Sequence, residues 1–110
     1  MRIVTLATCF ILAGCSTTAS QLGELPERYS IESKLDPQHI ADCIARETPG
    51  LYVPVTNGVG LDRSVVWRQE PLGAVVLFDI KATSSGSSVA IRSVTKALNG
   101  RIAKLAHCYR

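Results

Sequence analysis

The sequence predicts a small α+β domain: a four-stranded antiparallel sheet with two helices packed on one face. Two segments with helical spacing stand near the ends of this domain, and four short β-like segments lie between them. Tight turns connect these four segments. Because parallel strands need long crossover connections, such turns require an antiparallel meander. We therefore expect the element order α-β-β-β-β-α within residues 27–110.

The first helix is predicted over residues 37–47. Asp36 supplies an N-cap oxygen, and Pro37 occupies the first helical position, where a backbone N–H has no intrahelical partner to lose. Apolar side chains then recur at helical spacing: Ile40, Cys43 and Ile44. Pro49 and the glycine after it end the run.

Four segments have the composition of strands, and turn residues separate them. They are residues 51–56, 63–68, 74–82 and 89–94. Pro54 lacks a backbone N–H, which places the first strand at an edge of the sheet. Residues 74–82 form the most apolar segment and are expected at the centre. The second helix is predicted near residues 100–108, with Ile102 and Leu105 on one side.

Alternation along the central strand predicts which face is buried. The core face should carry Val76, Phe78, Ile80, Val89 and Ile91. This assignment leaves Asp79 and Arg92 together on the outer face as a cross-strand ion pair. Such an exposed pair contributes less than about 1 kcal/mol.

The N-terminus has the composition of an export signal. Arg2 is the one charge in residues 1–14, and residues 3–13 are mainly apolar. A membrane-spanning helix needs roughly 20 apolar residues, so this run is too short for a permanent span. It fits the hydrophobic region of a cleaved signal peptide. The small polar residues that follow predict a flexible tether, up to residue 26.

Leu12-Ala13-Gly14-Cys15 resembles the lipobox of bacterial lipoproteins. The resemblance implies cleavage after residue 14 and a lipidated Cys15, with a thioether-linked diacylglycerol and an amide-linked acyl chain. Two or more chains anchor a protein stably in a bilayer. A residue other than aspartate after the lipidated cysteine, here Ser16, is similar to the outer-membrane-directed class. The expected location is the periplasmic face of the bacterial outer membrane.

Cys43 and Cys108 are the two thiols that remain after cleavage and lipidation. An exported protein meets an oxidising compartment, so a structural disulfide is expected. By loop-closure entropy it would stabilise the domain by about 4 kcal/mol. The alternative is a zinc site that adds His39 and His107, although neighbouring residues on a helix diverge and zinc needs reduced thiolates. We expect no metal and no cofactor.

Two function classes have little support in the sequence. The net charge is only +3, and the sequence contains no cluster of basic residues. Both observations argue against a nucleic-acid partner. Asp36, His39 and Asp42 lie on or beside the first helix, but no strand-turn nucleophile motif accompanies them. We therefore expect a protein that is not an enzyme.

Trp67, Arg63 and Tyr52 are the candidate partner-binding residues. If Val66 points into the core, Trp67 and Arg63 are exposed beside Tyr52, and residues of these types dominate protein interfaces. If Trp67 points inward, it is a core residue. The pattern leaves both interpretations open.

A cysteine in the first helix, a hairpin-rich middle and the near-terminal Cys108 resemble small periplasmic lipoproteins of proteobacteria, many of which have no assigned activity. The expectation is a non-enzymatic binding or accessory lipoprotein that contacts the bilayer through Cys15 and an envelope protein or peptidoglycan. The alternative is an inhibitor or exclusion factor acting on an envelope hydrolase or phage receptor. Lysozyme-inhibitor lipoproteins are similar in size and export, but their Ser-Gly-x-x-Tyr loop has no counterpart here, because the run Ser85-Gly86-Ser87-Ser88 lacks the tyrosine.

Replacing Cys15 tests the lipidation. The Cys15→Ser variant should lose acylation, because no thiol remains for the thioether, and should accumulate as unprocessed precursor or as a soluble form. Mass spectrometry and detergent partitioning measure both outcomes. A variant that still enters the detergent phase with the native mass would contradict the lipobox assignment.

Overall fold

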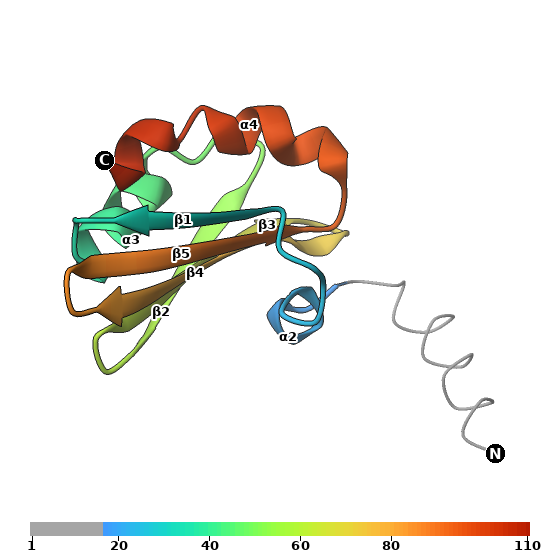
Figure 1. The fold of residues 1–110 in the computed structure, drawn as a ribbon. Helices are drawn as coiled ribbons and strands as arrows, with labels where there is room; N and C mark the ends of the chain where they lie inside the picture. Colours follow the sequence, from blue (N-terminus) through green and yellow to red (C-terminus); the bar gives the residue numbers. More distant parts are fainter. Residues whose placement is uncertain (1–16) are drawn as a thin grey trace, which may run out of the picture.

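The computed structural model describes residues 17–110, so the signal peptide and Cys15 lie outside the described residues. Its centre is a five-stranded antiparallel sheet in the order β1-β5-β4-β3-β2 (Figure 1). The strands are β1 (Tyr29–Ser33), β2 (Val53–Val59), β3 (Asp62–Gln69), β4 (Gly73–Thr83) and β5 (Gly86–Ser93). The predicted α+β class is confirmed, whereas the sheet has five strands and not four.

Helical segments cover both faces of the sheet. The larger layer consists of α3 (Pro37–Arg46), η1 (Lys96–Leu98), α4 (Asn99–Ala103) and η2 (Ala106–Tyr109). The short helix α2 (Ala19–Leu22) lies on the opposite side (Figure 1). No helix among residues 17–110 is both long enough and apolar enough to span a bilayer.

The additional strand is β1, which the sequence analysis did not predict. It pairs with β5, with Ile31 opposite Val89. In this edge strand Tyr29 and Ile31 are half-buried, whereas Ser30 and Glu32 are exposed. Ser33, at the end of the strand, is buried. Gly86 begins β5 at φ +148°, and a Cβ there would collide with the Ser33 carbonyl oxygen. The end of β1 can therefore approach the β4–β5 turn closely.

Helix α3 matches its predicted start and nearly its predicted end. The Asp36 carboxylate accepts a hydrogen bond from the His39 N–H at 2.7 Å. Pro37 opens the helix, which ends one residue before the expected position. The second predicted helix is instead broken into α4 and η2, so that the tail is less regular than its apolar spacing suggests.

The predicted core face of the central strand is confirmed. Val76, Phe78, Ile80, Val89 and Ile91 are all fully buried. On the outer face, Arg92 Nη1 lies 4.0 Å from Asp79 Oδ2, as expected for the cross-strand pair. The contact is diagonal, because the residue directly opposite Arg92 is Leu77.

The segment expected to be a flexible tether is instead packed against the outer face from residue 17 onward. The Thr17 N–H donates to the Leu72 carbonyl at 3.0 Å, and the Ala74 N–H donates to the Thr17 carbonyl at 2.7 Å. Leu22 is fully buried in a second, smaller core with Val66, Ala74 and Leu77. The tether prediction is wrong from residue 17 onward, because Leu22 packs against these apolar outer-face residues and shields them from water.

The second core gives a direct test of this correction. Leu22→Ala should lower the free energy of unfolding by about 2–5 kcal/mol, because it removes a fully buried side chain. Leu72→Ala is the matched control, since that side chain is 56% exposed and should change stability by less than about 0.5 kcal/mol. Urea unfolding of the full chain measures both. Equal effects would mean that α2 does not pack against the sheet in solution.

Candidate functional site: an apolar groove beside β1

The predicted surface patch of Trp67, Arg63 and Tyr52 is not present. Trp67 is fully buried and Tyr52 is 7% exposed, with their rings stacked at a centroid distance of 5.1 Å. Arg63 is half-buried, and its Nε donates to Gln38 Oε1 at 2.7 Å. Trp67 lies in the same core cluster as Phe78 and residues of α3, so the inward orientation is the correct one.

Cys43 and Cys108 form the predicted disulfide. The two Cα atoms are 5.6 Å apart, within the range that the bond requires, and the residues are separated by 65 positions. Both cysteines are buried. The bond therefore fastens α3 to η2, close to the end of the chain.

The zinc alternative fits the structure poorly. His107 Nε2 does approach Cys108 Sγ, at 3.9 Å, so these neighbours diverge less than expected. The ligand atoms of Cys43, His107 and Cys108 lie within 4.8 Å of one another, but His39 is not part of this group. The two sulfurs are bonded to each other and cannot act as thiolate ligands. The exposed His107 ring instead lies 3.7 Å from Glu47.

The acidic residues around α3 have structural roles. Asp36 caps the helix, and Asp42 Oδ1 accepts a hydrogen bond from Gln38 Nε2 at 2.8 Å. His39 is exposed and contributes its backbone N–H to the cap. Both carboxylates thus accept hydrogen bonds from groups of the helix itself.

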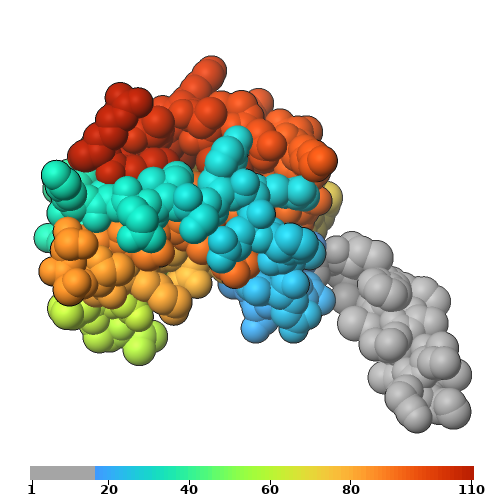
Figure 2. Space-filling model, in the orientation of Figure 1, coloured from blue at the N-terminus to red at the C-terminus, as the bar shows by residue number. Residues whose placement is uncertain are grey.

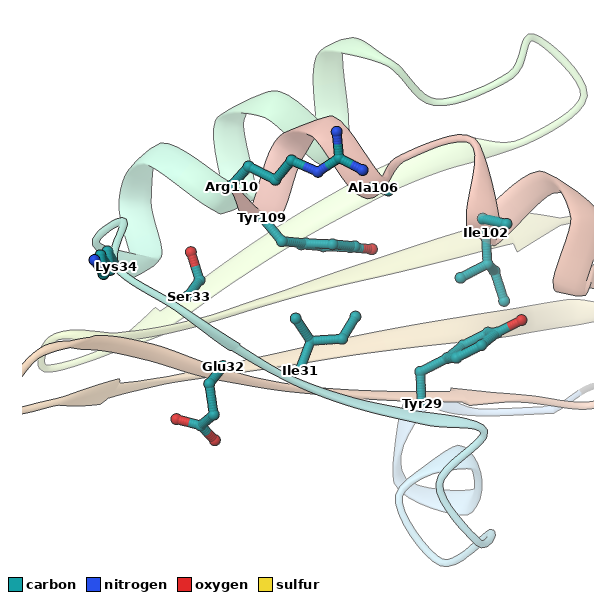
Figure 3. A pocket seen from close by; sticks show the side chains of 10 residues that line it. Tyr29, Ile31, Glu32, Ser33, Lys34, Ile102, Ala106, Tyr109 and Arg110 are labelled. Atoms are coloured by element: carbon teal, nitrogen blue, oxygen red, sulfur yellow. The ribbon is translucent and has the colours of Figure 1, made fainter.

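A groove lies between β1 and the C-terminal helical segment. Its volume is about 560 Å³, within the usual range for ligand sites of about 300–1,000 Å³. Tyr29 and Ile31 of β1 form one wall, and Ile102 and Tyr109 form the other (Figure 3). In Figure 2 the C-terminal segment, in red, lies above the residues of β1 on this face.

Small side chains leave the upper wall of this groove open. Ala103 and Ala106 line it from α4 and η2, and neither projects far enough to fill the space. Ile31 and Tyr29 point up toward this wall, while Glu32 points away to the other side of the sheet (Figure 3). The groove surface is therefore mainly aliphatic and aromatic.

Tyr109 brings a buried hydroxyl to the groove wall. The side chain is 7% exposed, and its Oη has no hydrogen-bond partner. Burial, with a smaller contribution from Tyr29, raises the pKa of Tyr109 well above its ordinary value of 10.0. The hydroxyl therefore stays protonated at physiological pH. An unpaired buried hydroxyl costs about 1–3 kcal/mol.

The groove runs beside an unpaired strand edge. Strand β1 has β5 on one side and ends the sheet on the other. An edge strand presents alternate backbone N–H and C=O groups without ladder partners. The exposed cations Lys34 and Arg110 stand at the rim. Backbone donors, an apolar slot and positive charge thus lie next to one another.

The groove lining is mainly apolar. Among the described residues that line it there is no histidine or cysteine, and the Ser33 hydroxyl accepts a hydrogen bond from the Leu35 N–H at 3.1 Å. No family model, curated protein or solved structure matches the chain. The alternation of Tyr29 and Ile31 was the available sequence signal for this wall.

The disulfide and zinc interpretations predict opposite responses. Reduction by dithiothreitol should lower the free energy of unfolding by about 4 kcal/mol, because the open chain regains the entropy of a long loop. EDTA should leave the melting temperature unchanged. Melting curves of the full chain in each reagent decide the question, and insensitivity to dithiothreitol combined with loss of stability in EDTA would contradict the disulfide.

Proposed function

We propose that this chain is a membrane-anchored, non-enzymatic binding lipoprotein at the periplasmic face of the outer membrane, and that it holds an extended segment of an envelope protein along β1. The observation that carries the proposal is the apolar groove beside an unpaired edge strand. This combination suits strand addition, in which backbone hydrogen bonds give affinity and a slot for alternate side chains gives specificity.

An incoming strand would extend the sheet past β1. Alternate residues of the five-residue strand β1 offer backbone N–H and C=O groups on its free side, and every second side chain of the bound segment would face the groove. Between Ile31 and Ile102 we expect an aliphatic or aromatic side chain. Lys34 and Arg110 at the rim favour an acidic residue nearby.

Peptidoglycan fits the groove less well than a polypeptide. Its sugars need many hydrogen-bond partners, whereas the walls are formed largely by Ile31, Ile102, Ala103 and Ala106. The inhibitor alternative depended on an exposed Trp67 side chain, which is buried. No observation therefore favours either alternative over an extended peptide.

The expected affinity is modest. Burying one large apolar side chain contributes about 1.5–3 kcal/mol, and each ladder hydrogen bond about 0.5–1.5 kcal/mol. Association costs at least about 4 kcal/mol in lost freedom. Anchoring both partners at one membrane would raise their effective concentration and offset a weak intrinsic affinity.

Lipidation would hold the domain close to the bilayer. Thr17 is already hydrogen-bonded to the sheet, so a single residue, Ser16, separates it from Cys15 in the sequence. The α2 side of the domain would then lie near the lipid, with the β1 groove on the opposite side of the sheet. This arrangement leaves the groove accessible from the periplasm.

A photocrosslinker in the groove tests the proposal in cells. A photoreactive residue at Ala103, which lines the groove, should capture an envelope protein. The matched control is Lys104, an exposed neighbour that does not line it. Ala106→Trp should fill the groove and remove the product obtained from position 103, while an unchanged melting temperature shows that the variant folds.

The outcomes separate the possible partners. A polypeptide crosslinked from position 103 and lost with Ala106→Trp supports the proposal. A product containing peptidoglycan sugars would overturn the peptide assignment. Equal products from positions 103 and 104 would show that the groove is not the contact surface.

A further inference from the structure

A cluster of metal-ligating side chains surrounds the disulfide at the end of α3. The ligand atoms of Cys43, His107 and Cys108 all lie within 4.8 Å of one another. The Glu47 carboxylate adds a fourth group, because its Oε1 lies 3.7 Å from His107 Nε2. Two sulfurs, one imidazole nitrogen and one carboxylate oxygen are all atom types that bind zinc in proteins. His39, the other histidine of the chain, is not part of this group.

The spacing of these atoms is close to that around a tetrahedral zinc ion. His107 Nε2 lies 3.9 Å from Cys108 Sγ, and zinc bonds of the usual lengths would hold such a pair about 3.6 Å apart. A nitrogen and a carboxylate oxygen on zinc are separated by about 3.4 Å, close to the 3.7 Å between His107 and Glu47. The bond between Cys43 and Cys108 is what prevents their sulfurs from taking part.

The two segments that carry the ligands have anchors other than the disulfide. Cys43 and Glu47 are four positions apart at the C-terminal end of α3, so they share one face of the helix. Ile44 of the same helix is fully buried. Leu105 is also buried, and its carbonyl accepts a hydrogen bond from the Cys108 N–H at 2.8 Å. In Figure 1 the C-terminal segment, in red, ends beside α3. These contacts keep the ligands near one another when the sulfurs are not bonded.

We propose that reduction of the disulfide converts this cluster into a zinc site formed by Cys43, Cys108, His107 and Glu47. A dithiol reductant of the thiol–disulfide exchange class supplies two electrons and two protons, which gives two thiols here and a disulfide in the reductant. Zn²⁺ then binds the two thiolates, and both thiol protons pass to solvent. The chain thus has two states, a disulfide without metal and a zinc dithiolate, and in each of them α3 is joined to η2.

The surroundings of the cluster suit a metal ion. The side chains of His107 and Glu47 are 55% and 43% exposed, whereas both cysteines are buried, so the ion would arrive from the histidine side. Two thiolates and one carboxylate around Zn²⁺ leave one net negative charge. Arg46 lies 4.0 Å from Glu47, and Arg101 and Lys104 line a small pocket together with Glu47, so cations offset that charge. None of the four ligands lines the β1 groove, so the metal site does not rest on the function proposed there.

Metal binding by the full chain in its two redox states tests the proposal. Cys9→Ser and Cys15→Ser leave Cys43 and Cys108 as the only thiols, so a metal–thiolate absorption band must come from this cluster. A phosphine reduces the disulfide and becomes the phosphine oxide, with its oxygen taken from water. The reduced chain in mild detergent should then bind one equivalent of Co²⁺ with a sulfur-to-metal charge-transfer band, and Zn²⁺ should displace the cobalt. The disulfide form should show no such band.

Histidine and glutamate variants identify the other ligands. His107→Ala and Glu47→Gln should each lower the zinc affinity of the reduced chain at least about tenfold, since even a group that only orients a metal ligand contributes about 10- to 100-fold. His39→Ala is the matched control, because that exposed histidine lies outside the cluster and its loss should leave the affinity unchanged. Competition with a chromophoric chelator measures all three.

Melting curves keep the test decisive even where reduction loosens the fold. Zinc should raise the melting temperature of the reduced chain, or restore its folded circular-dichroism spectrum, because a metal that binds the folded state stabilises it. The disulfide form should not respond to zinc. A cobalt band together with this stabilisation supports the proposal. Reduced protein that shows neither, or His107→Ala and Glu47→Gln variants that bind zinc as tightly as His39→Ala, would overturn it.

Discussion

The disulfide between Cys43 and Cys108 is the constraint on which the candidate site depends. Segments α4 and η2 have five and four residues, far below the length at which an isolated helix is stable in water. They keep their place because Ile102 and Leu105 are buried and because Cys108 is covalently joined to α3. Tyr109 directly follows that cysteine and forms part of the groove wall. The stability of the fold and the shape of the site thus rest on the same bond.

A sheet with apolar residues on both faces imposes the rest of the architecture. The larger face packs against α3 and the C-terminal segment, while the outer face presents Val66 and Leu77. A domain of this size cannot leave a second apolar face in water without losing stability. Four residues of α2, anchored by Leu22, are the cover that the chain provides. The N-terminal segment is accordingly part of the fold from Thr17 onward.

Strong local signals explain which elements could be predicted from the sequence. Asp36 and Pro37 mark the start of α3, alternation along β4 identifies the core face, and two remaining cysteines allow one pairing. Strand β1 has serines and a glutamate between its apolar residues, and as an edge strand it has a weak pattern. Because β1 was missing from the predicted sheet, the groove could not be predicted either, since Tyr29 and Ile31 of β1 form one of its walls.

Trp67 shows why alternation alone could not decide the candidate patch. Period-two alternation identifies the buried face when one face is wet, but both faces of β3 are covered. Val66 and Trp67 are neighbours, and both are buried, in different cores. The orientation follows from the pairing of Trp67 with Val76 and from its stacking on Tyr52, which are tertiary contacts with no local sequence signature.

The two edges of the sheet differ in the kind of association that each can support. At β1, backbone groups lie next to an apolar groove with Lys34 and Arg110 at its rim, the arrangement on which the proposed binding of an extended segment rests. At β2, the free edge is seven residues long, uncharged and largely apolar. The strand order places β1 and β2 at the two ends of the sheet, so the proposed binding of a segment along β1 would leave the β2 edge unchanged.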